Sequence, residues 1–446
     1  MGARSSLVRR GAVLLAGAML AGLPITSSSA QGEGAQRYIV VLERGVPAHA
    51  AAHDHSRSEN AQVGFVYEHA INGYSATMSP QAAERIGRDP RVEYVEPDIE
   101  LHASAQTLPT GVNRIDAELS PTARINGIDE RVDVDIAILD SGIDLDHPDL
   151  NVVANTGCAS GGPTNNVCTN GAGDDNNGHG THVAGIAAAI DNTIGVVGVA
   201  PGARLHAVKV LDSRGSGYLS WIIAGIDWVT ARSATIEVAN MSLGGQGWSS
   251  AYRTAIANSV SRGVVYYVAA GNERRDIYGT DNTFGTSDDT IPASFPEVGT
   301  ISALADFDGR PGGLGSGSWS YGAPASCTES RDDSFACFSN FAKNNANSPV
   351  TSSGGKIDMM LPGTAIVSTY PGGYASTHGT SQASPHAAGL AALYIARNGR
   401  ATTASGVYSI RQALINAGYG QTTTNGLTTH DDPDLRKEPL GWGAAL

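Results

Sequence analysis

From residue 132 onward, short apolar segments alternate with longer segments whose apolar residues recur every three or four positions. The short segments have the length and composition of buried strands, and the longer ones have the period of helices. The expected strands are 134–140, 203–211, 236–243, 263–272 and 299–305, and the expected helices are 179–190, 216–231, 249–262 and 385–397. Repeated strand–helix units of this kind predict an α/β fold with a doubly wound parallel sheet and right-handed crossovers.

The preceding segment, residues 37–101, has a different order of elements. Its pattern predicts strand, helix, strand, strand, helix and strand, with a hairpin that turns at Asn72-Gly73. That order indicates a small α+β domain of the ferredoxin-like kind. Residues 104–111 contain a proline and a glycine that interrupt the pattern, so we expect a domain boundary there.

The first 30 residues have the composition of a signal peptide. Three arginines, at positions 4, 9 and 10, precede an apolar stretch, Ala12–Leu23, that is too short to span a bilayer. Small residues lead up to Ala30, after which we expect cleavage. Twin-arginine export also fits, so the export route stays open. We expect a secreted protein, extracellular or periplasmic, with no membrane anchor.

The four cysteines agree with an oxidising compartment. Cys158 lies near Cys168, and Cys327 lies near Cys337, so local pairing is the simplest of the three possible connectivities. Free buried thiols are the alternative. No C-x-x-C spacing points to a metal site.

The charge balance excludes some partners. The chain has 446 residues, with 43 Asp and Glu against 29 Lys and Arg, and a formal net charge of −14. Binding to nucleic acid or to an anionic membrane needs a basic surface, and this sequence lacks one. We therefore expect no nucleic-acid partner.

Three polar residues in glycine-rich motifs stand where expected strands end or helices begin. Asp140 closes a strand in DSGID, His179 opens a helix in NNGHGTHVAG, and Ser381 begins another in HGTSQASPHAAG. A serine hydroxyl is a weak nucleophile, but an imidazole oriented by a buried carboxylate removes its proton. An aspartate, a histidine and a serine in such motifs therefore predict acyl transfer by a catalytic triad.

Each motif also has a structural interpretation. An aspartate after a strand commonly forms a turn, and a serine before a helix commonly caps it. His179 and His182 suggest a zinc hydrolase, although no H-E-x-x-H motif accompanies them. The three motifs together favour the triad. A zinc hydrolase and a non-catalytic binding protein on the same fold remain the alternatives.

Nearly the whole chain resembles the subtilisin-like serine peptidases, or subtilase family. The blocks VKVLDSRGSGYLSWIIAGIDWV, NMSLGG, AAGNE, DMMLPG and GTSQASPHAAG carry the resemblance, and residues 37–101 resemble the family's inhibitor propeptide. The resemblance implies a secreted serine endopeptidase, a monomer that acts on proteins and peptides. Residues 1–30 are then the signal peptide, 31–104 the propeptide, which serves as chaperone and inhibitor, and 105–446 the catalytic domain. It also implies self-cleavage between Ser104 and Ala105.

Further site residues follow from the resemblance. Asn272 in AAGN matches the side-chain donor that stabilises the oxyanion, together with the backbone N–H of Ser381. The residues that match the strands holding the substrate backbone are Gly215, Ser216, Gly217, Ser242, Leu243 and Gly244. Glycine suits these positions because another backbone must approach closely. These six residues carry no charge, so we expect small or apolar side chains at P1, the substrate residue whose carbonyl is attacked.

The resemblance also implies a structural calcium site. Its side chains are Gln106, Asp149 and Asn192, and its backbone carbonyls are those of Ile190, Ile194 and Val196. Oxygen ligands of this kind suit calcium. A plain Asn-rich turn is the alternative. The acidic loop with Asp281, Asp288 and Asp289 is a second candidate for an ion.

Overall fold

The computed structural model describes residues 35–98, 106–159, 167–313, 315–322, 326–343, 357–420, 432–434 and 438–446. The chain divides into two compact units, Met1–His102 and Ala103–Leu446. The expected signal peptide and the expected processing point after Ser104 lie outside the described residues.

The first unit has the predicted order of elements. These are β1 (Gln36–Leu42), α1 (Ala48–Glu59), β2 (Gln62–Tyr67), β3 (Gly73–Met78), α2 (Pro80–Ile86) and β4 (Val92–Pro97). The strands form an antiparallel sheet in the order β2-β3-β1-β4. Its core contains Val40 and Leu42 of β1, Tyr74 of β3 and three alanines of α1. The ferredoxin-like prediction is confirmed.

The β2–β3 connection differs from the predicted tight turn. The two strands are joined by residues 68–72, and Gly73 is already the first residue of β3. The Asn72 side chain donates to the carbonyls of Glu43 and Val46, which ties the loop to the end of β1. A Cβ on Gly73 would lie 2.1 Å from the Val40 carbonyl oxygen. The Asn-Gly pair therefore serves a close backbone contact and not a two-residue turn.

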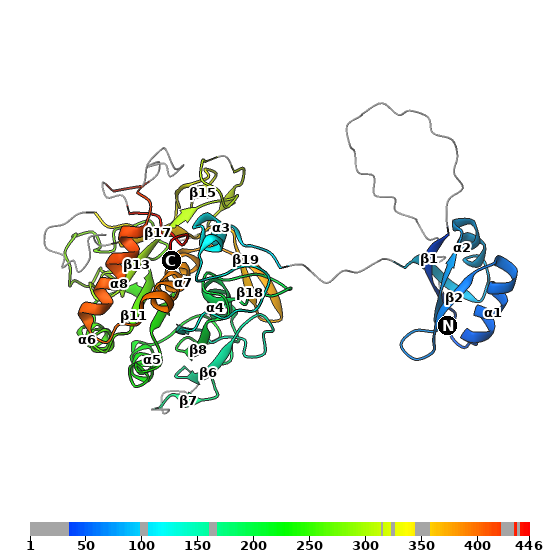
Figure 1. Cartoon of the computed structure of the whole chain (residues 1–446), viewed down its shortest axis with the longest axis horizontal. Coiled ribbons are helices and arrows are strands. Elements are labelled where there is room, and N and C mark those ends of the chain that lie inside the picture. The colour runs from blue at the N-terminus through cyan, green and yellow to red at the C-terminus, as the bar shows by residue number, and fades with distance from the viewer. Residues whose placement is uncertain are drawn as a thin grey trace, which may run out of the picture. The chain divides into compact units, whose positions relative to one another are not determined.

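The second unit is built on a mostly parallel sheet (Figure 1). Its strands are β5 (Asp135–Asp140), β6 (Val152–Gly157), β7 (Thr169–Asn170), β8 (Arg204–Lys209), β9 (Val238–Met241), β11 (Val265–Ala269), β13 (Gly299–Ala305), β16 (Ser334–Phe335) and β17 (Met359–Pro362). The order is β16-β13-β11-β9-β5-β8-β6-β7, and β17 pairs with β13. Within the described residues, β7 and β16 pair antiparallel and the other strands pair parallel. The predicted doubly wound α/β architecture is confirmed.

Three small two-stranded sheets lie outside the main sheet. They pair β10 (Gly245–Gln246) with β12 (Thr290–Ile291), β14 (Trp319–Ser320) with β15 (Thr328–Glu329), and β18 (Ile366–Tyr370) with β19 (Gly373–Thr377). Two disulfides, Cys158–Cys168 and Cys327–Cys337, have the predicted local pairing. The alternative of free buried thiols is therefore wrong.

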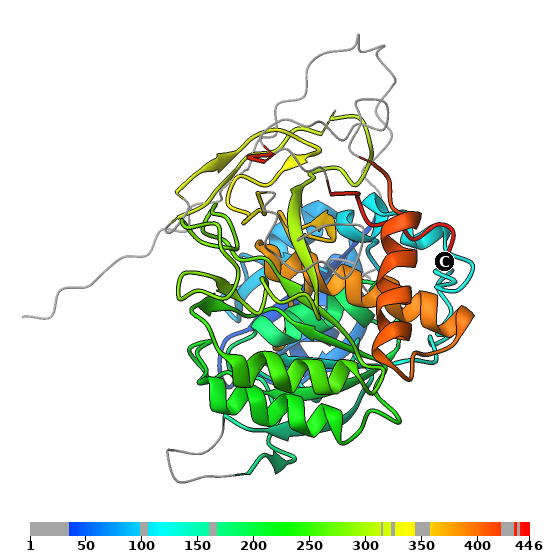
Figure 2. The same cartoon turned by 90° about the vertical axis from the view of Figure 1, so that its left-hand side faces the viewer.

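The helices of the second unit pack in pairs. They are α3 (Thr110–Arg114), a 3₁₀ turn (Ala117–Leu119), α4 (His179–Ala188), α5 (Leu219–Thr230), α6 (Ser250–Val260), α7 (Thr380–Asn398) and α8 (Ala404–Ala417). Helix α4 lies against α7, which also contacts β9, β11 and β13, and α5 lies beside α6 (Figure 2). Serine or threonine side chains cap α6 and α8. Among the described residues, no helix is long and apolar enough to cross a membrane.

Two histidines are buried in the packed pair of helices α4 and α7. His182 Nε2 lies 3.1 Å from the carbonyl oxygens of Ile366 and Ala375, and His386 Nδ1 lies 2.8 Å from the carbonyl oxygen of Gln382. Burial lowers the pKa of both imidazoles to about 4. Both rings are therefore neutral in the folded protein at mildly acidic pH.

We expect the free energy of unfolding to fall as the pH drops from about 6.5 to about 4. In this window the unfolded chain binds protons at His182 and His386 and the folded state does not, so acid favours unfolding. His386→Gln should lower the slope of unfolding free energy against pH by up to about 1.4 kcal/mol per pH unit. Urea unfolding between pH 5 and 7 measures this slope, and an unchanged slope would contradict the prediction.

Candidate active site

The candidate site lies where neighbouring parallel strands end. Strands β5, β9 and β11 are adjacent in the sheet. Asp140 is the last residue of β5, Ser242 directly follows β9, and Asn272 lies three residues beyond β11. Because carboxyl ends of parallel strands share one edge, these three residues emerge on the same side of the sheet.

His179, the first residue of α4, faces the end of β5. Its Nδ1 lies 2.7 Å from Oδ1 of Asp140, whose side chain is fully buried. Burial acts to lower the pKa of His179, but the charge and hydrogen bond of Asp140 and the charge of Asp175 outweigh it and raise that pKa. The acceptor at Nδ1 leaves Nε2 as the nitrogen able to accept a proton.

A second carboxylate fixes the start of α4. Asp175 accepts hydrogen bonds from the backbone N–H groups of Asn177, Gly178 and Thr181 and from the Ser141 hydroxyl. The N–H groups of Gly178 and Thr181 are among the unpaired donors expected at a helix N-terminus. Asp175 therefore orients the helix that presents the imidazole.

Ser381 is the second residue of α7. Its Oγ donates to the Ser242 carbonyl at 3.3 Å, and among the described residues it makes no hydrogen bond to His179. Pro385 has no N–H to give the Ser381 carbonyl, which instead accepts from the Ser242 hydroxyl at 2.8 Å. The Ser242 side chain is thus committed to holding the serine backbone.

The Asn272 amide has a defined orientation. Its Oδ1 accepts from the backbone N–H of Thr380 at 2.9 Å and from the Thr380 hydroxyl at 3.0 Å. The Thr380 N–H is a donor, so the oxygen must face it and Nδ2 must point away. No described residue accepts from this Nδ2 or pairs with the Ser381 N–H, so both donors are available to a ligand.

Two adjoining pockets flank the segment 242–246. The larger, of about 610 Å³, is lined by His179 and by the predicted Gly215, Ser216, Gly217, Ser242, Leu243 and Gly244. The smaller, of about 190 Å³, is lined by Ser381, Asn272 and residues 242–246. Residues 215–217 and 242–244 were expected in strands, but both segments lie outside regular secondary structure. Residues 215–217 precede α5, and residues 242–244 lie between β9 and β10. A free edge of this kind can pair with an extended peptide.

The residues predicted to bind calcium lie together. The site comprises Gln106, Asp149, Ile190, Asn192, Ile194 and Val196. The Gln106 amide nitrogen donates to the carbonyls of Ile190 and Val196, at 2.6 and 3.0 Å. The partly positive amide group of Gln106 thus lies between two carbonyl oxygens. Asp149 is fully buried, and burial raises the pKa of its carboxyl group. Ile194 contributes its N–H to Asn192, and no contact of its carbonyl is observed among the described residues.

The second candidate for an ion is not supported. Asp281, Asp288 and Asp289 bind loop hydroxyls and backbone N–H groups within residues 280–286. Among the described residues, the acidic group close enough to hold one metal ion lies elsewhere. It consists of Asp306, Asp308 and Asp332, which the sequence analysis missed because Asp332 lies 24 residues beyond Asp308 in the chain.

The zinc alternative is also unsupported. His182 Nε2 lies between two carbonyl oxygens, so it must carry a proton and cannot bind a metal. The His179 Nδ1 faces Asp140. The pair does not form a shared metal site.

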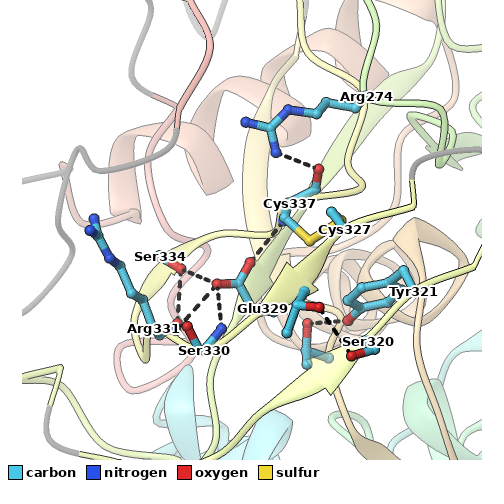
Figure 3. Close-up of a disulfide and its surroundings, with 11 residues drawn as sticks. Arg274, Ser320, Tyr321, Cys327, Glu329, Ser330, Arg331, Ser334 and Cys337 are labelled. Carbon is cyan, nitrogen blue, oxygen red and sulfur yellow. Dashed lines mark hydrogen bonds between the residues drawn. A yellow bond between two sulfur atoms is a disulfide. The ribbon is translucent and has the colours of Figure 1, made fainter.

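The segment closed by Cys327–Cys337 supports the loop that carries Asn272 (Figure 3). Arg274 Nη1 donates to the Cys337 carbonyl at 2.8 Å, and Glu329 accepts from the Cys337 N–H within the same segment. The described residues 326–343 line neither pocket of the candidate site, but they hold the adjoining loop in place.

Comparison with known proteins places the chain in a family. Two family models match: the Subtilase family over residues 132–443 and Peptidase inhibitor I9 over residues 37–104. Subtilisin E from Bacillus subtilis (strain 168) is 37% identical over 385 residues, covering 84% of this chain and 85% of that protein. Subtilisin J from Geobacillus stearothermophilus is 38% identical over 368 residues, covering 81% of each.

A solved structure agrees with these matches. The crystal structure of a cold adapted subtilisin-like serine proteinase aligns with a TM-score of 0.51 and 26% identity, covering 77% of this chain and 100% of that chain. The chain therefore belongs to the subtilase family of serine endopeptidases, with an I9 inhibitor propeptide domain before the peptidase domain.

Proposed function

We propose that Asp140, His179 and Ser381 are the catalytic triad of this peptidase. The observation that carries the proposal is the 2.7 Å contact between His179 Nδ1 and Asp140, which leaves His179 Nε2 as a base beside the pockets. In this mechanism Nε2 takes the proton of Ser381 Oγ as the oxygen attacks the peptide carbonyl. The same proton then goes to the leaving amine, and water hydrolyses the acyl-enzyme by the reverse route.

The tetrahedral intermediate places a negative charge on the former carbonyl oxygen. Asn272 Nδ2 and the Ser381 N–H are the two available donors beside the nucleophile, and the Ser381 N–H belongs to the positive end of the α7 dipole. We assign these two groups as the oxyanion hole.

Asn340 is a positioning residue for this oxyanion hole. Its side chain is fully buried; Oδ1 accepts from the N–H groups of Glu273 and Arg275, and Nδ2 donates to the Ala270 carbonyl. Its own N–H donates to the Gly271 carbonyl at 2.9 Å. These contacts lie on both sides of Asn272, so Asn340 holds the loop that aims the Asn272 amide.

Maturation and export complete the proposal. The I9 domain supports a zymogen whose propeptide, 31–104, assists folding and inhibits the enzyme until self-cleavage releases residues 105–446. The signal-like residues 1–30 and the two disulfides support secretion. We propose that the mature enzyme is a monomer acting on proteins and peptides.

We further propose structural calcium at the site of Gln106 and Asp149. With its amide turned, Gln106 would offer its oxygen to the ion, alongside the Asp149 carboxylate, the Asn192 side chain and the carbonyls of Ile190, Ile194 and Val196. The ion would supply positive charge that cross-links the segment before α3 to the end of α4. No catalytic step depends on it.

Ser381→Ala should leave the purified precursor uncut, because the propeptide is removed by the enzyme's own nucleophile. The wild-type enzyme should begin at Ala105, with Gln106 and Thr107 next, as read by Edman sequencing. Added wild-type enzyme should cut the variant at the same bond, which controls for misfolding. Spontaneous maturation of pure Ser381→Ala would contradict self-processing.

Asn340→Ala should lower kcat about tenfold or more with a smaller change in KM, since the loss of an oxyanion donor typically costs about 10²–10³ in rate. If Asn340 acts through Asn272, the variant should cost little in an Asn272→Ala background. The measurement is a double-mutant cycle on one peptide substrate. Equal losses in both backgrounds would show that Asn340 acts independently of Asn272.

Calcium should raise the melting temperature of the mature enzyme by several degrees, because binding to the folded state alone stabilises it by about 2.7 kcal/mol at 100 times Kd. Asp149→Asn should abolish most of this gain. Asp281→Asn removes the same charge from an exposed loop and serves as the control. A full calcium response in Asp149→Asn would place the ion elsewhere, for instance at the acidic group of Asp306.

A further inference from the structure

The smaller pocket beside Ser381 contains charged side chains that the sequence analysis did not expect. Ser381 and Asn272 lie in its lining, and residues 242–246 and Thr290 form other parts of the wall. If Ser381 attacks and Asn272 binds the oxyanion, as proposed above, the side chain next to the attacked carbonyl enters this cavity. The pocket is therefore the P1 pocket, and its lining selects the P1 residue.

Arg275 is the cationic residue of this lining. Its Nη2 lies 3.4 Å from Oγ1 of Thr290, and its Nε is buried without a hydrogen-bond partner. By contrast, Arg214, which lines the larger pocket, forms an ion pair with Asp212. No carboxylate among the described residues forms an ion pair with Arg275. A guanidinium with spare donors is suited to bind a carboxylate.

The position of Arg275 is fixed by its backbone. Its N–H donates to Asn340 Oδ1 at 3.1 Å, and its carbonyl accepts from the Phe341 N–H at 3.1 Å. Both partners belong to the segment that follows the Cys327–Cys337 disulfide. The arginine is thus held on a supported loop, with its side chain directed to the Thr290 wall.

Glu273 also lines the pocket, and the negative charge of its carboxylate opposes the effect of the positive charge of Arg275. Its Oε2 accepts from Asn340 Nδ2 at 2.7 Å, and the residue as a whole is exposed to solvent. Solvent and the Asn340 amide screen its charge. The buried Nε of Arg275 has neither solvent nor a hydrogen-bond partner to screen the positive charge. The charge of Arg275 therefore has the larger effect within the cavity.

We propose that Arg275 makes the P1 pocket select an acidic side chain, with glutamate favoured over its neutral analogue glutamine. The carboxylate of the substrate accepts hydrogen bonds from the terminal Nη groups of the guanidinium, and a lysine at P1 is repelled. This inference rests on the proposed function of Ser381 and replaces the expectation of a small or apolar P1 residue. Ser104 at the processing site remains compatible, because a tethered segment reaches the nucleophile without an optimal P1 residue.

The test uses mature enzyme and four peptides that differ only at P1, which is Glu, Gln, Leu or Lys. We expect kcat/KM to be about tenfold higher for Glu than for Gln at low salt, with Lys the poorest. The Glu-to-Gln ratio should shrink in high salt, because salt screens the charge pair. Arg275→Gln should bring this ratio close to one, and Arg275→Lys should keep part of it.

Arg262→Gln is the matched control, because it removes the same charge from an exposed residue that lines neither pocket of the site. It should leave the ratio unchanged. Glu273→Gln should raise the ratio. A preference for Leu or Lys over Glu, or an unchanged ratio in Arg275→Gln, would overturn the role of Arg275. Cleavage of none of the four peptides would instead contradict the proposed function. If Arg275→Gln does not fold, the wild-type ratio and its salt dependence decide.

Discussion

The register of three neighbouring parallel strands sets the geometry on which the site depends. Ile138 of β5 pairs with Asn240 of β9, and Asn240 pairs with Tyr267 of β11. Asp140 and Ser242 therefore leave the sheet at the same level, each two residues beyond its paired position. A slip of one residue would turn every side chain of the strand to the other face of the sheet. The backbone ladder thus positions the carboxylate and the Ser381-binding segment before any side-chain contact forms.

Two helix N-termini meet this edge of the sheet, and their unpaired N–H groups are used differently. At α4 the buried carboxylate of Asp175 accepts them, and its negative charge helps to raise the pKa of His179. At α7 the neutral Asn272 oxygen accepts the Thr380 N–H, and the Ser381 N–H has no described partner. A carboxylate at α7 would cancel the positive end of the dipole where we propose that the oxyanion binds. The neutral amide keeps that end available.

Local sequence patterns predicted much of this structure. Asp140 was located because an apolar strand pattern ends there, and His179 because a helical pattern begins there. The order of elements in the first unit followed from the alternation of apolar and polar residues. Helix α8 and the β18–β19 hairpin were not predicted. Asn340 and Arg275 could not be assigned roles, because their contact joins two loops 65 residues apart that have no periodicity. The neutral P1 expectation came from residues 215–217 and 242–244 alone, since the other wall of the pocket is formed by a loop of unpredictable path.

The proposed oxyanion donor and the residue proposed to select the P1 side chain lie in one short loop. Asn272 and Arg275 are three residues apart, and the side-chain Oδ1 of Asn340 accepts hydrogen bonds from the N–H groups of both Glu273 and Arg275. The groups proposed to perform the chemistry are anchored in the sheet and helices, where the fold leaves little freedom. Glu273 and Arg275, which we propose to face the P1 residue, belong to a loop held by the segment that contains the Cys327–Cys337 disulfide and Asn340. The backbone of Arg275, and not its side chain, contacts Asn340. On the proposed roles, a substitution of the Arg275 side chain can therefore change the preferred P1 residue while Asn340 still holds the oxyanion donor in place. Substrate selectivity can then vary while the catalytic residues stay the same.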